Sequence, residues 1–317
     1  MIQSNIHTAM NRKVIGIGET ILDILFRDGQ PQAAVPGGSV YNAMISLGRM
    51  GVDVTFISET GNDRVGQMIL DNMRANGVRT DNVNVFPDGK SPVSLAFLNE
   101  HNDAEYIFYK DYPRQRLDVT MPDIQADDIV MIGSYFAVTP VLRDKVKELL
   151  DLARERGAII YYDVNFRSTH ANEAIKLMPT ILENFEYADI LRGSSEDFRF
   201  MFGLDDAEKV YRQKVSFYCN PFIYTDGARD VSLFTRAYAN RFPVPKVETV
   251  STIGAGDNFN AGIVYGLIQN RIRRSDIDAL GKKDWDDIIA CGLAFGSEAC
   301  RSTANCVSLE FAQTFRR

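Results

Sequence analysis

Residues 250–262 combine a glycine-rich turn with a carboxylate, Asp257. Gly254 and Gly256 allow the backbone to turn tightly and place no side chain between it and a ligand. Apolar residues at helical spacing follow, so a buried helix begins near Gly256. The unpaired amides and the dipole of a helix start form a site for an anion such as phosphate. A carboxylate there repels the anion unless it has a task, such as accepting the proton of an attacking hydroxyl. The alternative is that Asp257 only complements the helix start.

Asp23 is a second carboxylate in an unusual place, inside the apolar run 22–26. The run predicts a short strand. A lone carboxylate there is either a strand-end residue that faces water or a ligand for hydroxyl groups. Further on, Gly37 and Gly38 form a turn that leads into an apolar helix containing Asn42, and Ser39 is in position to be the N-cap of that helix.

A charged segment follows the most apolar predicted strand, residues 158–162. Such a continuous apolar run is typical of a parallel sheet that is buried on both faces. Asn165 and Arg167 come soon after it, at the edge where open α/β sheets bind their ligands. The planar guanidinium of Arg167 is suited to neutralise the charge of a phosphate group.

The elements that must hold these residues are of two kinds. From residue 127 onward, apolar strands alternate with helical patterns, which predicts an α/β fold with a mostly parallel sheet. Earlier in the chain, alternating strands on either side of a polar turn at 99–103 predict a hairpin. A helix over residues 284–301, rich in small residues, is the last predicted element.

Composition excludes several classes of protein. The chain has 317 residues and a net charge of −7, which argues against a nucleic-acid partner. Four cysteines without a C-x-x-C pair and three scattered histidines argue against a zinc site. No apolar run is long enough to span a membrane, and the polar N-terminus lacks the features of a signal peptide. We therefore expect a cytoplasmic protein.

Together these motifs resemble the signatures of the ribokinase-like (PfkB-type) carbohydrate kinases. Residues 252–262 match the signature D-T-x-G-A-G-D-x-F-x-x-G from its threonine onward, whereas Ser251 stands where many members carry aspartate. Gly37, Gly38 and Asn42 match a second signature, G-G-x-x-x-N, and residues 163–167 match D-x-N-x-R. The resemblance runs in family order from about residue 14 to about residue 306.

The resemblance implies a fold. It would be a ribokinase-like three-layer α/β sandwich with a mostly parallel central sheet and a small β-sheet lid. A single domain would cover residues 13–317, with the lid formed by roughly residues 20–36 and 83–112 and a polar extension at residues 1–12. A homodimer that forms through the lid is a further expectation.

The resemblance also implies roles for the residues singled out above. Asp257 would be the catalytic base, and the anion hole would be formed by Gly254, Ala255 and Gly256. Arg167 would assist at the phosphate. The residues expected to bind the sugar are Asp23, Gly37, Gly38, Asn42 and Asp257.

A further set of residues would bind ATP. The expected contacts to the nucleotide are Asn165, Ser194, Thr225, Gly227, Gly254 and Gly256. In the family motif N-x-x-E, Ser194 replaces the asparagine, Asp197 takes the glutamate position and Glu196 is adjacent. Either carboxylate would support Mg²⁺, through water, although serine and acids also suit a capped helix start. Ser251 and the altered terminal loop at residues 303–305 argue against the monovalent-cation site of many family members.

The expected function is ATP-dependent phosphorylation of a sugar hydroxyl, and the overall pattern is most similar to the fructokinases of this family. Ribokinase, 2-keto-3-deoxygluconate kinase and nucleoside kinase are the alternatives within the same enzyme class. A sugar-sensing protein of the same fold is the alternative without turnover. The intact Asp257 loop argues against a sensor, because a protein that only binds sugar does not need a base.

Overall fold

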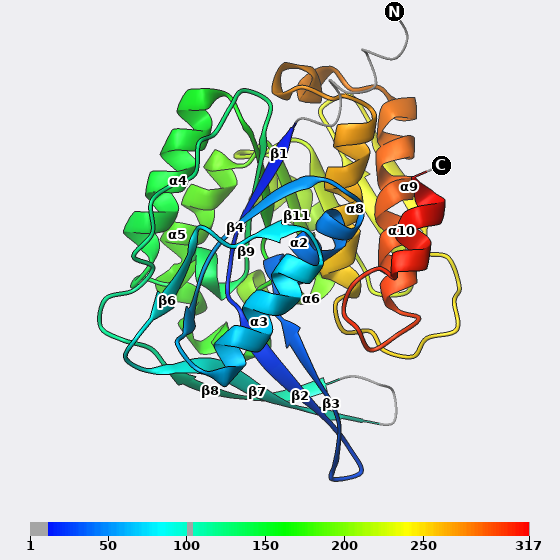
Figure 1. Cartoon of the computed structure of the whole chain (residues 1–317). Helices are drawn as coiled ribbons and strands as arrows, with labels where there is room; N and C mark the ends of the chain where they lie inside the picture. The colour runs from blue at the N-terminus through cyan, green and yellow to red at the C-terminus, as the bar shows by residue number, and fades with distance from the viewer. Residues whose placement is uncertain (1–11, 100–103, 317) are drawn as a thin grey trace, which may run out of the picture.

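The computed structural model describes residues 12–99 and 104–316, which form two β-sheets and the helices around them (Figure 1). The larger sheet contains β1 (Lys13–Ile17), β4 (Asp53–Gly61), β5 (Val78–Arg79), β6 (Val83–Phe86), β9 (Ile129–Gly133), β10 (Ile159–Asp163), β11 (Ile190–Ser194), β12 (Phe222–Thr225), β13 (Asp230–Phe234) and β14 (Ala239–Pro243). The smaller sheet contains β2 (Ile21–Arg27), β3 (Gln30–Gly37), β7 (Lys90–Leu98) and β8 (Ala104–Asp111). The α-helices are α2 (Ser39–Arg49), α3 (Arg64–Ala75), α4 (Arg143–Arg156), α5 (Ala174–Tyr187), α6 (Ser195–Phe202), α7 (Ala207–Val210), α8 (Ala255–Gln269), α9 (Lys282–Ala299) and α10 (Leu309–Phe315).

The larger sheet has the order β14-β13-β12-β11-β10-β9-β1-β4-β5, and β6 also pairs with β4. Neighbouring strands from β12 to β5 are parallel, whereas β13 and β14 extend one edge in antiparallel fashion. All of β10 is buried, because helices cover both faces of the sheet. Since the strands are parallel, their carboxyl ends share one edge, and Asp163 and Ser194 end β10 and β11 there.

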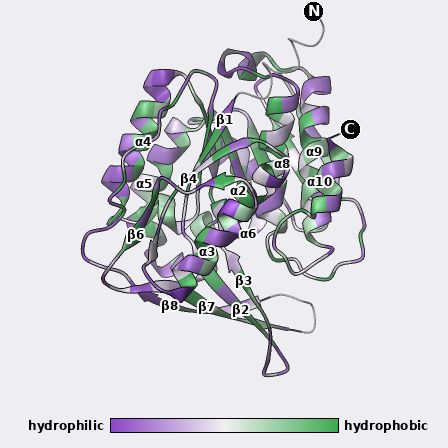
Figure 2. Cartoon of the chain, in the orientation of Figure 1, coloured by the Kyte–Doolittle hydropathy of each residue, from purple (hydrophilic) through white to green (hydrophobic). Residues whose placement is uncertain are grey.

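Helices form a layer on each face of the larger sheet (Figure 1). One hydrophobic core lies under α4, α5 and α6, and the other lies under α2, α3, α8, α9 and α10. In α4 the buried residues Val146, Leu149, Leu150 and Ala153 follow the helical period, so one side of the helix packs on the sheet. Purple and green alternate along α4 and α9 in Figure 2, as expected for helices with one side in water.

Helix α8 differs from the others because every residue from 257 to 268 is buried. It packs closely against α9, where a Cβ atom on Gly262 would lie 2.4 Å from the carbonyl oxygen of Cys291. A side chain at position 262 would therefore push the two helices apart. This close packing fixes the place where α8 begins, at the glycine-rich loop.

The smaller sheet lies over the edge where the parallel strands end (Figure 1). Within it, β2 is parallel to β7, while β3 and β8 pair with them antiparallel. The predicted second lid segment, 83–112, begins too early, because β6 pairs with β4 of the larger sheet. Of the turn predicted at 99–103, residues 100–103 lie outside the described residues.

Two helix boundaries differ from the predictions. Gly38, not Ser39, is the N-cap of α2. Ser39 is the first residue of the helix, and no side chain caps this end of it. The helix predicted over 284–301 is α9, which ends at Ala299, and α10 follows it. The predicted α/β architecture with a mostly parallel sheet is confirmed. Within the described residues, no helix has the length and apolarity that crossing a bilayer requires.

Candidate active site

A cleft of about 1390 Å³ lies between the smaller sheet and the carboxyl ends of the parallel strands. It also reaches the first turn of α8. Most of the predicted site residues line it, namely Asp23, Gly38, Asn42, Asn165, Arg167, Ser194, Glu196, Asp197, Gly254, Gly256 and Asp257. Four predicted residues are not among those that line the cleft: Gly37, Thr225, Gly227 and Ala255.

Asp23 occupies the part of the cleft formed by the smaller sheet. Its side chain is buried, and one carboxylate oxygen accepts a hydrogen bond from the Ser94 hydroxyl on β7. On β3, Gly37 leaves room for the other oxygen, which would lie 2.7 Å from a Cβ atom at that position. Burial raises the pKa of Asp23 to about 6, against the opposing effects of Ser94 and Arg167. The carboxylate thus combines burial with an orientation toward the cleft.

Helix α2 connects this region to the glycine-rich loop. Gly38 begins the helix with φ of 131°, and a Cβ atom there would lie 2.1 Å from the carbonyl oxygen of Glu19, so only glycine fits. One turn later, Asn42 Nδ2 donates a hydrogen bond to Asp257 Oδ2 at 2.8 Å. The two signature motifs, 215 residues apart, therefore meet in a single hydrogen bond.

Asp257 lies in the first turn of α8, after the N-cap Gly254. The amides of Gly256 and Asp257 have no acceptor within the helix, as is general for helix starts. The Ala255 amide donates to the Thr252 carbonyl oxygen at 3.2 Å, so fewer amides face a ligand than the sequence predicted. Burial raises the pKa of Asp257 to about 6, whereas Asn42 and Arg167 lower it. At neutral pH the carboxylate is mainly ionised and able to accept a proton.

Arg167 lines the same cleft as the two carboxylates, Asp23 and Asp257. Its side chain is exposed to the solvent of the cleft, and its guanidinium carbon is 5.2 Å from the centre of the Tyr106 ring. Burial among the cleft walls would lower the pKa of Arg167, but the charges of Tyr106, Asp257 and Asp23 raise it above its usual value. Arg167 therefore supplies positive charge to the region where a substrate would meet Asp257.

Asp197 stabilises the part of the cleft lining where α6 begins. Ser194 and Asp197 cap α6 reciprocally, with Ser194 N donating to Asp197 Oδ2 at 2.6 Å and Asp197 N donating to Ser194 Oγ at 3.2 Å. Asp197 Oδ1 accepts from the Phe166 amide at 2.7 Å. This contact fixes the loop that carries Asn165 and Arg167. Burial, followed by the charge of Asp163, raises the pKa of Asp197 to about 6.

The carboxylates of this wall suit a magnesium ion that arrives with a nucleotide. Glu196 is exposed to the cleft and forms an ion pair with Arg199 at 3.4 Å. Among residues 12–99 and 104–316, no three His, Cys, Asp or Glu side chains gather into a metal site. Magnesium bound to phosphate keeps several waters and needs only one or two protein carboxylates. The exposed carboxylate of Glu196 fits such an ion, whereas both Asp197 oxygens accept backbone amides and would reach the ion through water.

Sequence reasoning missed Arg192, which is buried at the centre of a polar network. Its Nη1 donates to Asp163 Oδ1 at 2.9 Å and its Nη2 donates to Thr225 Oγ1 at 2.6 Å. Asn260 Nδ2 completes the network with a 2.7 Å hydrogen bond to Asp163 Oδ2. Thr225 therefore uses its hydroxyl inside the protein, and Gly227 lies in the turn before β13. The available signal was an arginine in a short apolar strand, since a buried charge requires a partner.

The Arg192 guanidinium lies beside Gly256 of the glycine-rich loop and also lines the cleft. A Cβ atom on Gly256 would be 3.0 Å from Arg192 Nη2, so the glycine allows the charge to approach the loop. Burial would lower the pKa of Arg192, but Asp163 and Asp197 raise it, so the group stays charged. A largely buried cation thus lies next to the amides of the α8 start, which favours an anion at this end of the helix.

His170 is a second residue that sequence reasoning did not assign. It lines the cleft, stacks on Tyr135 with ring centres 3.9 Å apart, and has its Nδ1 atom 3.3 Å from Glu173 Oε1. Burial lowers the pKa of His170. No pattern in the sequence distinguishes this histidine from an ordinary loop residue.

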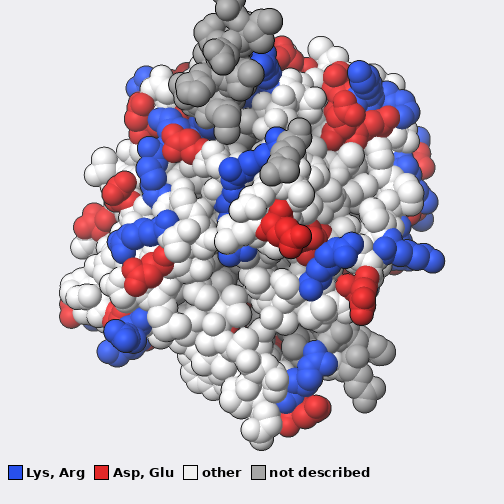
Figure 3. Space-filling view, turned by 45° about the vertical axis from the view of Figure 1, so that its right-hand side comes forward, with Lys and Arg blue, Asp and Glu red and all other residues white. Residues whose placement is uncertain are grey.

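Acidic and basic side chains are mixed on the surface shown in Figure 3, and neither sign forms a broad patch on that face. The polar groups described above are instead concentrated in the cleft.

Comparisons with known proteins identify the family and the fold. The family described as pfkB family carbohydrate kinase matches residues 12–311. A fructokinase from Rhizobium leguminosarum bv. trifolii is 27% identical over 281 residues, which cover 85% of this chain and 84% of the relative. The crystal structure of a fructokinase double mutant from Vibrio cholerae O395, in fructose, ADP and potassium ion bound form, has a TM-score of 0.82 and 20% identity, covering 96% of this chain and 98% of that one.

A third similar protein is aminoimidazole riboside kinase from Salmonella enterica, complexed with aminoimidazole riboside and an ATP analog. Its TM-score is 0.78 with 23% identity, and the match covers 96% of this chain and 100% of that chain. At these identities the structural matches establish the fold, which is ribokinase-like. Because the family match spans nearly the whole sequence, the chain belongs to the pfkB family of carbohydrate kinases.

Proposed function

We propose that this chain transfers a phosphoryl group from ATP to a hydroxyl of a sugar, and that the sugar is fructose. The observation that carries the proposal is the position of Asp257. It is buried in the first turn of α8, hydrogen-bonded to Asn42 at 2.8 Å, and adjacent to helix-start amides that lie beside the buried charge of Arg192. A base beside an anion site is the arrangement that phosphoryl transfer requires.

In the proposed reaction the sugar lies between Asp23, Asn42 and Arg167. Asp257 accepts the proton of the attacking hydroxyl while the hydroxyl oxygen forms a bond to the terminal phosphorus of ATP. The bond from that phosphorus to the bridging oxygen breaks and ADP leaves. The amides of the α8 start and the Arg167 guanidinium stabilise the transferring group. The proton then passes from Asp257 to solvent.

The nucleotide would occupy the wall formed by Asn165, Ser194 and the glycine-rich loop. Glu196 and Asp197 would hold Mg²⁺, partly through water, and the ion supplies neutralisation of the phosphate charge. Asp197 is already bonded to two backbone amides, so the more exposed Glu196 is the better candidate for direct contact.

Fructose is proposed because several curated relatives with similar coverage are fructokinases, at 21% to 27% identity. The aminoimidazole riboside kinase of similar fold keeps a riboside substrate as the second candidate. A sugar sensor without turnover is the alternative outside the enzyme class, and it does not explain why a carboxylate with a pKa of about 6 lies beside an anion site.

The test is ATP consumption across a panel of fructose, ribose, 2-keto-3-deoxygluconate and a nucleoside, with Asp257→Asn as the matched control. We expect ATP consumption with fructose that depends on Asp257. If another compound of the panel has a much higher kcat/KM than fructose, that compound replaces fructose as the proposed substrate. Sugar binding by calorimetry without turnover of any compound would contradict the kinase proposal and favour the sensor.

A homodimer that forms through the smaller sheet is a further proposal. It is supported by apolar side chains on β8 that are exposed, with Ile107 at 45% and Tyr109 at 58% exposure. Light scattering should give twice the mass of one chain, and Ile107→Glu should give the monomer. A monomer at all concentrations in the unmodified protein would contradict this proposal.

A further inference from the structure

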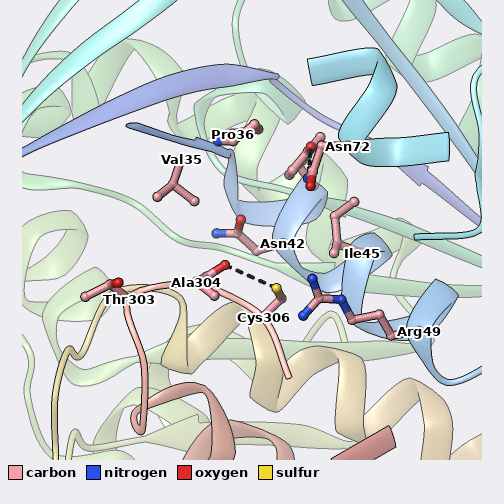
Figure 4. Close-up of a pocket in the computed structure, with 10 residues that line it drawn as sticks. Val35, Pro36, Asn42, Ile45, Arg49, Asn72, Thr303, Ala304 and Cys306 are labelled. Carbon is pink, nitrogen blue, oxygen red and sulfur yellow. Dashed lines mark hydrogen bonds between the residues drawn. The ribbon is translucent and has the colours of Figure 1, made fainter. Parts of the chain in front are cut away.

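Two other segments meet the glycine-rich loop where helix α8 begins. Helix α2 and the terminal loop, residues 303–307, are both hydrogen-bonded there. Figure 4 shows the adjoining cavity of about 270 Å³, with Asn42 and Arg49 of α2 facing Ala304 and Cys306 of the terminal loop. Arg49 Nη1 donates to the Val307 carbonyl oxygen at 2.7 Å, which joins the helix to the loop.

Asn258, the residue after Asp257, contacts all three segments. Its Nδ2 atom donates to the Gly254 carbonyl oxygen at 2.7 Å and to the Asn305 carbonyl oxygen at 2.9 Å. Its Oδ1 atom accepts a hydrogen bond from the Ser46 hydroxyl of α2. The side chain is completely buried. One amide thus joins the glycine-rich loop, the terminal loop and α2.

The orientation of this amide is determined by its partners. The Val307 amide donates to Ser46 Oγ at 3.1 Å, so the Ser46 hydroxyl proton is left to donate to Asn258. The two backbone carbonyls can only accept hydrogen bonds, so they must face the NH₂ group. Ser46 and Asn42 are one helical turn apart, and they bond consecutive residues of α8, Asn258 and Asp257.

The oxygen atoms at this junction do not form a site that would bind a monovalent cation strongly. At the position where the family resemblance places a cation-binding aspartate, this chain has Ser251, a neutral residue whose hydroxyl accepts a hydrogen bond from Ile253 N at 3.2 Å. The Gly254 and Asn305 carbonyls already have a hydrogen-bond donor. A cation here would gain no carboxylate charge and would share these carbonyls with the Asn258 amide.

We propose that Asn258 is a positioning residue that joins the glycine-rich loop to the terminal loop in place of a monovalent cation. The inference rests on the kinase activity proposed above and predicts that this activity needs no added potassium. Ser46 orients Asn258, and Asn258 in turn keeps Gly254 and the adjacent amides in the geometry that receives phosphate. Helix α2, which carries Ser46, also positions Asp257 through the hydrogen bond from Asn42.

The experiment compares Asn258→Ala with Asn270→Ala. Asn270 is the matched control, because its Nδ2 donates to the Gly266 carbonyl at 2.9 Å at the other end of α8, far from the loop in sequence. Turnover is measured with tetramethylammonium chloride and then during a potassium titration at constant ionic strength. We expect potassium to change the turnover of the unmodified protein and of Asn270→Ala by less than twofold. Asn258→Ala should lose about tenfold in kcat, equal to about 1.4 kcal/mol, and recover part of it with potassium.

A second readout does not need turnover. The melting temperature of Asn258→Ala should rise selectively with potassium over tetramethylammonium, whereas that of the unmodified protein should not. If Asn258→Ala fails to fold, Ser46→Ala replaces it, with the same direction and a smaller effect.

The outcomes separate the two proposals. Tenfold activation of the unmodified protein by potassium would overturn this inference and leave the kinase activity intact. A loss in Asn258→Ala without any potassium response, in turnover or melting, would also overturn it. Absence of turnover with every sugar would contradict the proposed function, and the melting-temperature comparison would still decide the role of Asn258.

The side chain of Asn305 provides an internal check. It is 1% exposed, and neither of its amide atoms has a hydrogen-bond partner among the described residues. It is therefore the remaining group at this junction that could accept a cation. The Asn305→Ala variant should respond to potassium as little as the unmodified protein does, with less than a twofold change in turnover. A potassium response that this variant removes would place a cation at Asn305 and contradict the inference.

Discussion

The buried aspartates around the cleft form two pairs that differ in how their oxygens are used. Asp163 has both oxygens bonded, to Arg192 at 2.9 Å and to Asn260 at 2.7 Å. Asp197 likewise accepts two backbone amides, at 2.6 and 2.7 Å. Asp23 and Asp257 each accept one side-chain hydrogen bond, from Ser94 and Asn42 respectively. In the described part of the chain, their second oxygens accept no further protein hydrogen bond.

The difference separates framework from ligand-binding groups. A buried carboxylate is stable when its oxygens are all paired, so Asp163 and Asp197 hold the strand ends and loops together. A largely buried carboxylate that leaves one oxygen facing the cleft is less stable until water or a ligand binds that oxygen. Asp23 and Asp257 carry this cost at the places where a sugar hydroxyl would bind. The following predictions test that distinction.

Asp257→Asn should have the largest effect on catalysis. The amide keeps the shape of the side chain but cannot accept the proton, so kcat should fall roughly 10²–10⁴-fold, the usual scale for acid–base catalysis. Binding of sugar and ATP, measured by calorimetry, should be retained. Turnover within tenfold of the unmodified enzyme would show that another group takes the proton.

Asp163→Asn should act on stability instead. It removes the charged partner of buried Arg192, and breaking a buried ion pair in this way costs about 3–5 kcal/mol in the free energy of unfolding. Urea denaturation measures the loss. A loss below about 1 kcal/mol, typical of an exposed pair, would mean that Asp163 does not belong to the framework pair.

Asp23→Ala should raise the KM for sugar and leave the KM for ATP nearly unchanged. The lost contact to a sugar hydroxyl involves a charged acceptor, so the expected increase is about 10- to 100-fold. Ser94→Ala is the matched control, because it keeps the carboxylate and removes only its partner. Equal changes in both KM values would assign Asp23 to the framework.

Asp257→Asn should also stabilise the folded protein at pH 8, by about 1–2 kcal/mol. Burial raises the pKa of Asp257 from 3.8 to about 6, so the folded state disfavours the ionised form. The resulting penalty is absent below the unfolded pKa and complete above about pH 6. Unfolding curves at pH 8 and at pH 3.5 should differ accordingly. If the variant gains the same free energy of unfolding at both pH values, the gain comes from packing and not from the removed charge.

The pH profile should show the smallest effect. The pKa values of both Asp23 and Asp257 are raised to about 6 by burial. Both must be ionised for sugar binding and proton transfer, so log(kcat/KM) should fall with a slope approaching two below that pH. Asp23→Asn should reduce the slope to about one. An unchanged slope in the variant would remove Asp23 from the ionisations that control activity.

Much of the site follows from the sequence because polar residues at the ends of parallel strands converge on one edge. This rule, with the two signatures, brought Asp23, Asn42, Arg167 and Asp257 to one cleft. The rule says nothing about which groups are bonded to each other. The Asn42–Asp257 bond and the role of Arg192 depend on packing between segments far apart in the chain.

Other details were not predictable for the same reason. The sequence pattern included residues 83–86 in the predicted lid, but the structure pairs them, as β6, with β4 of the larger sheet. The Ala255 amide has the sequence position of an anion donor, yet it closes a turn with Thr252. The motif leaves position 258 unspecified, so nothing in the pattern pointed to Asn258, whose contacts come from α2 and the terminal loop.

Gly262 has a consequence for how this chain tolerates change. It touches no ligand in the proposed reaction, but a Cβ atom there would lie 2.4 Å from the Cys291 carbonyl oxygen. Any larger residue would displace α8 as a rigid body, and Asp257 lies little more than one helical turn away. In a library of random variants selected for activity, position 262 should accept as few replacements as position 257. Residues on the outer surface of α9 should accept many, so selection would map the interface between the helices as clearly as the site.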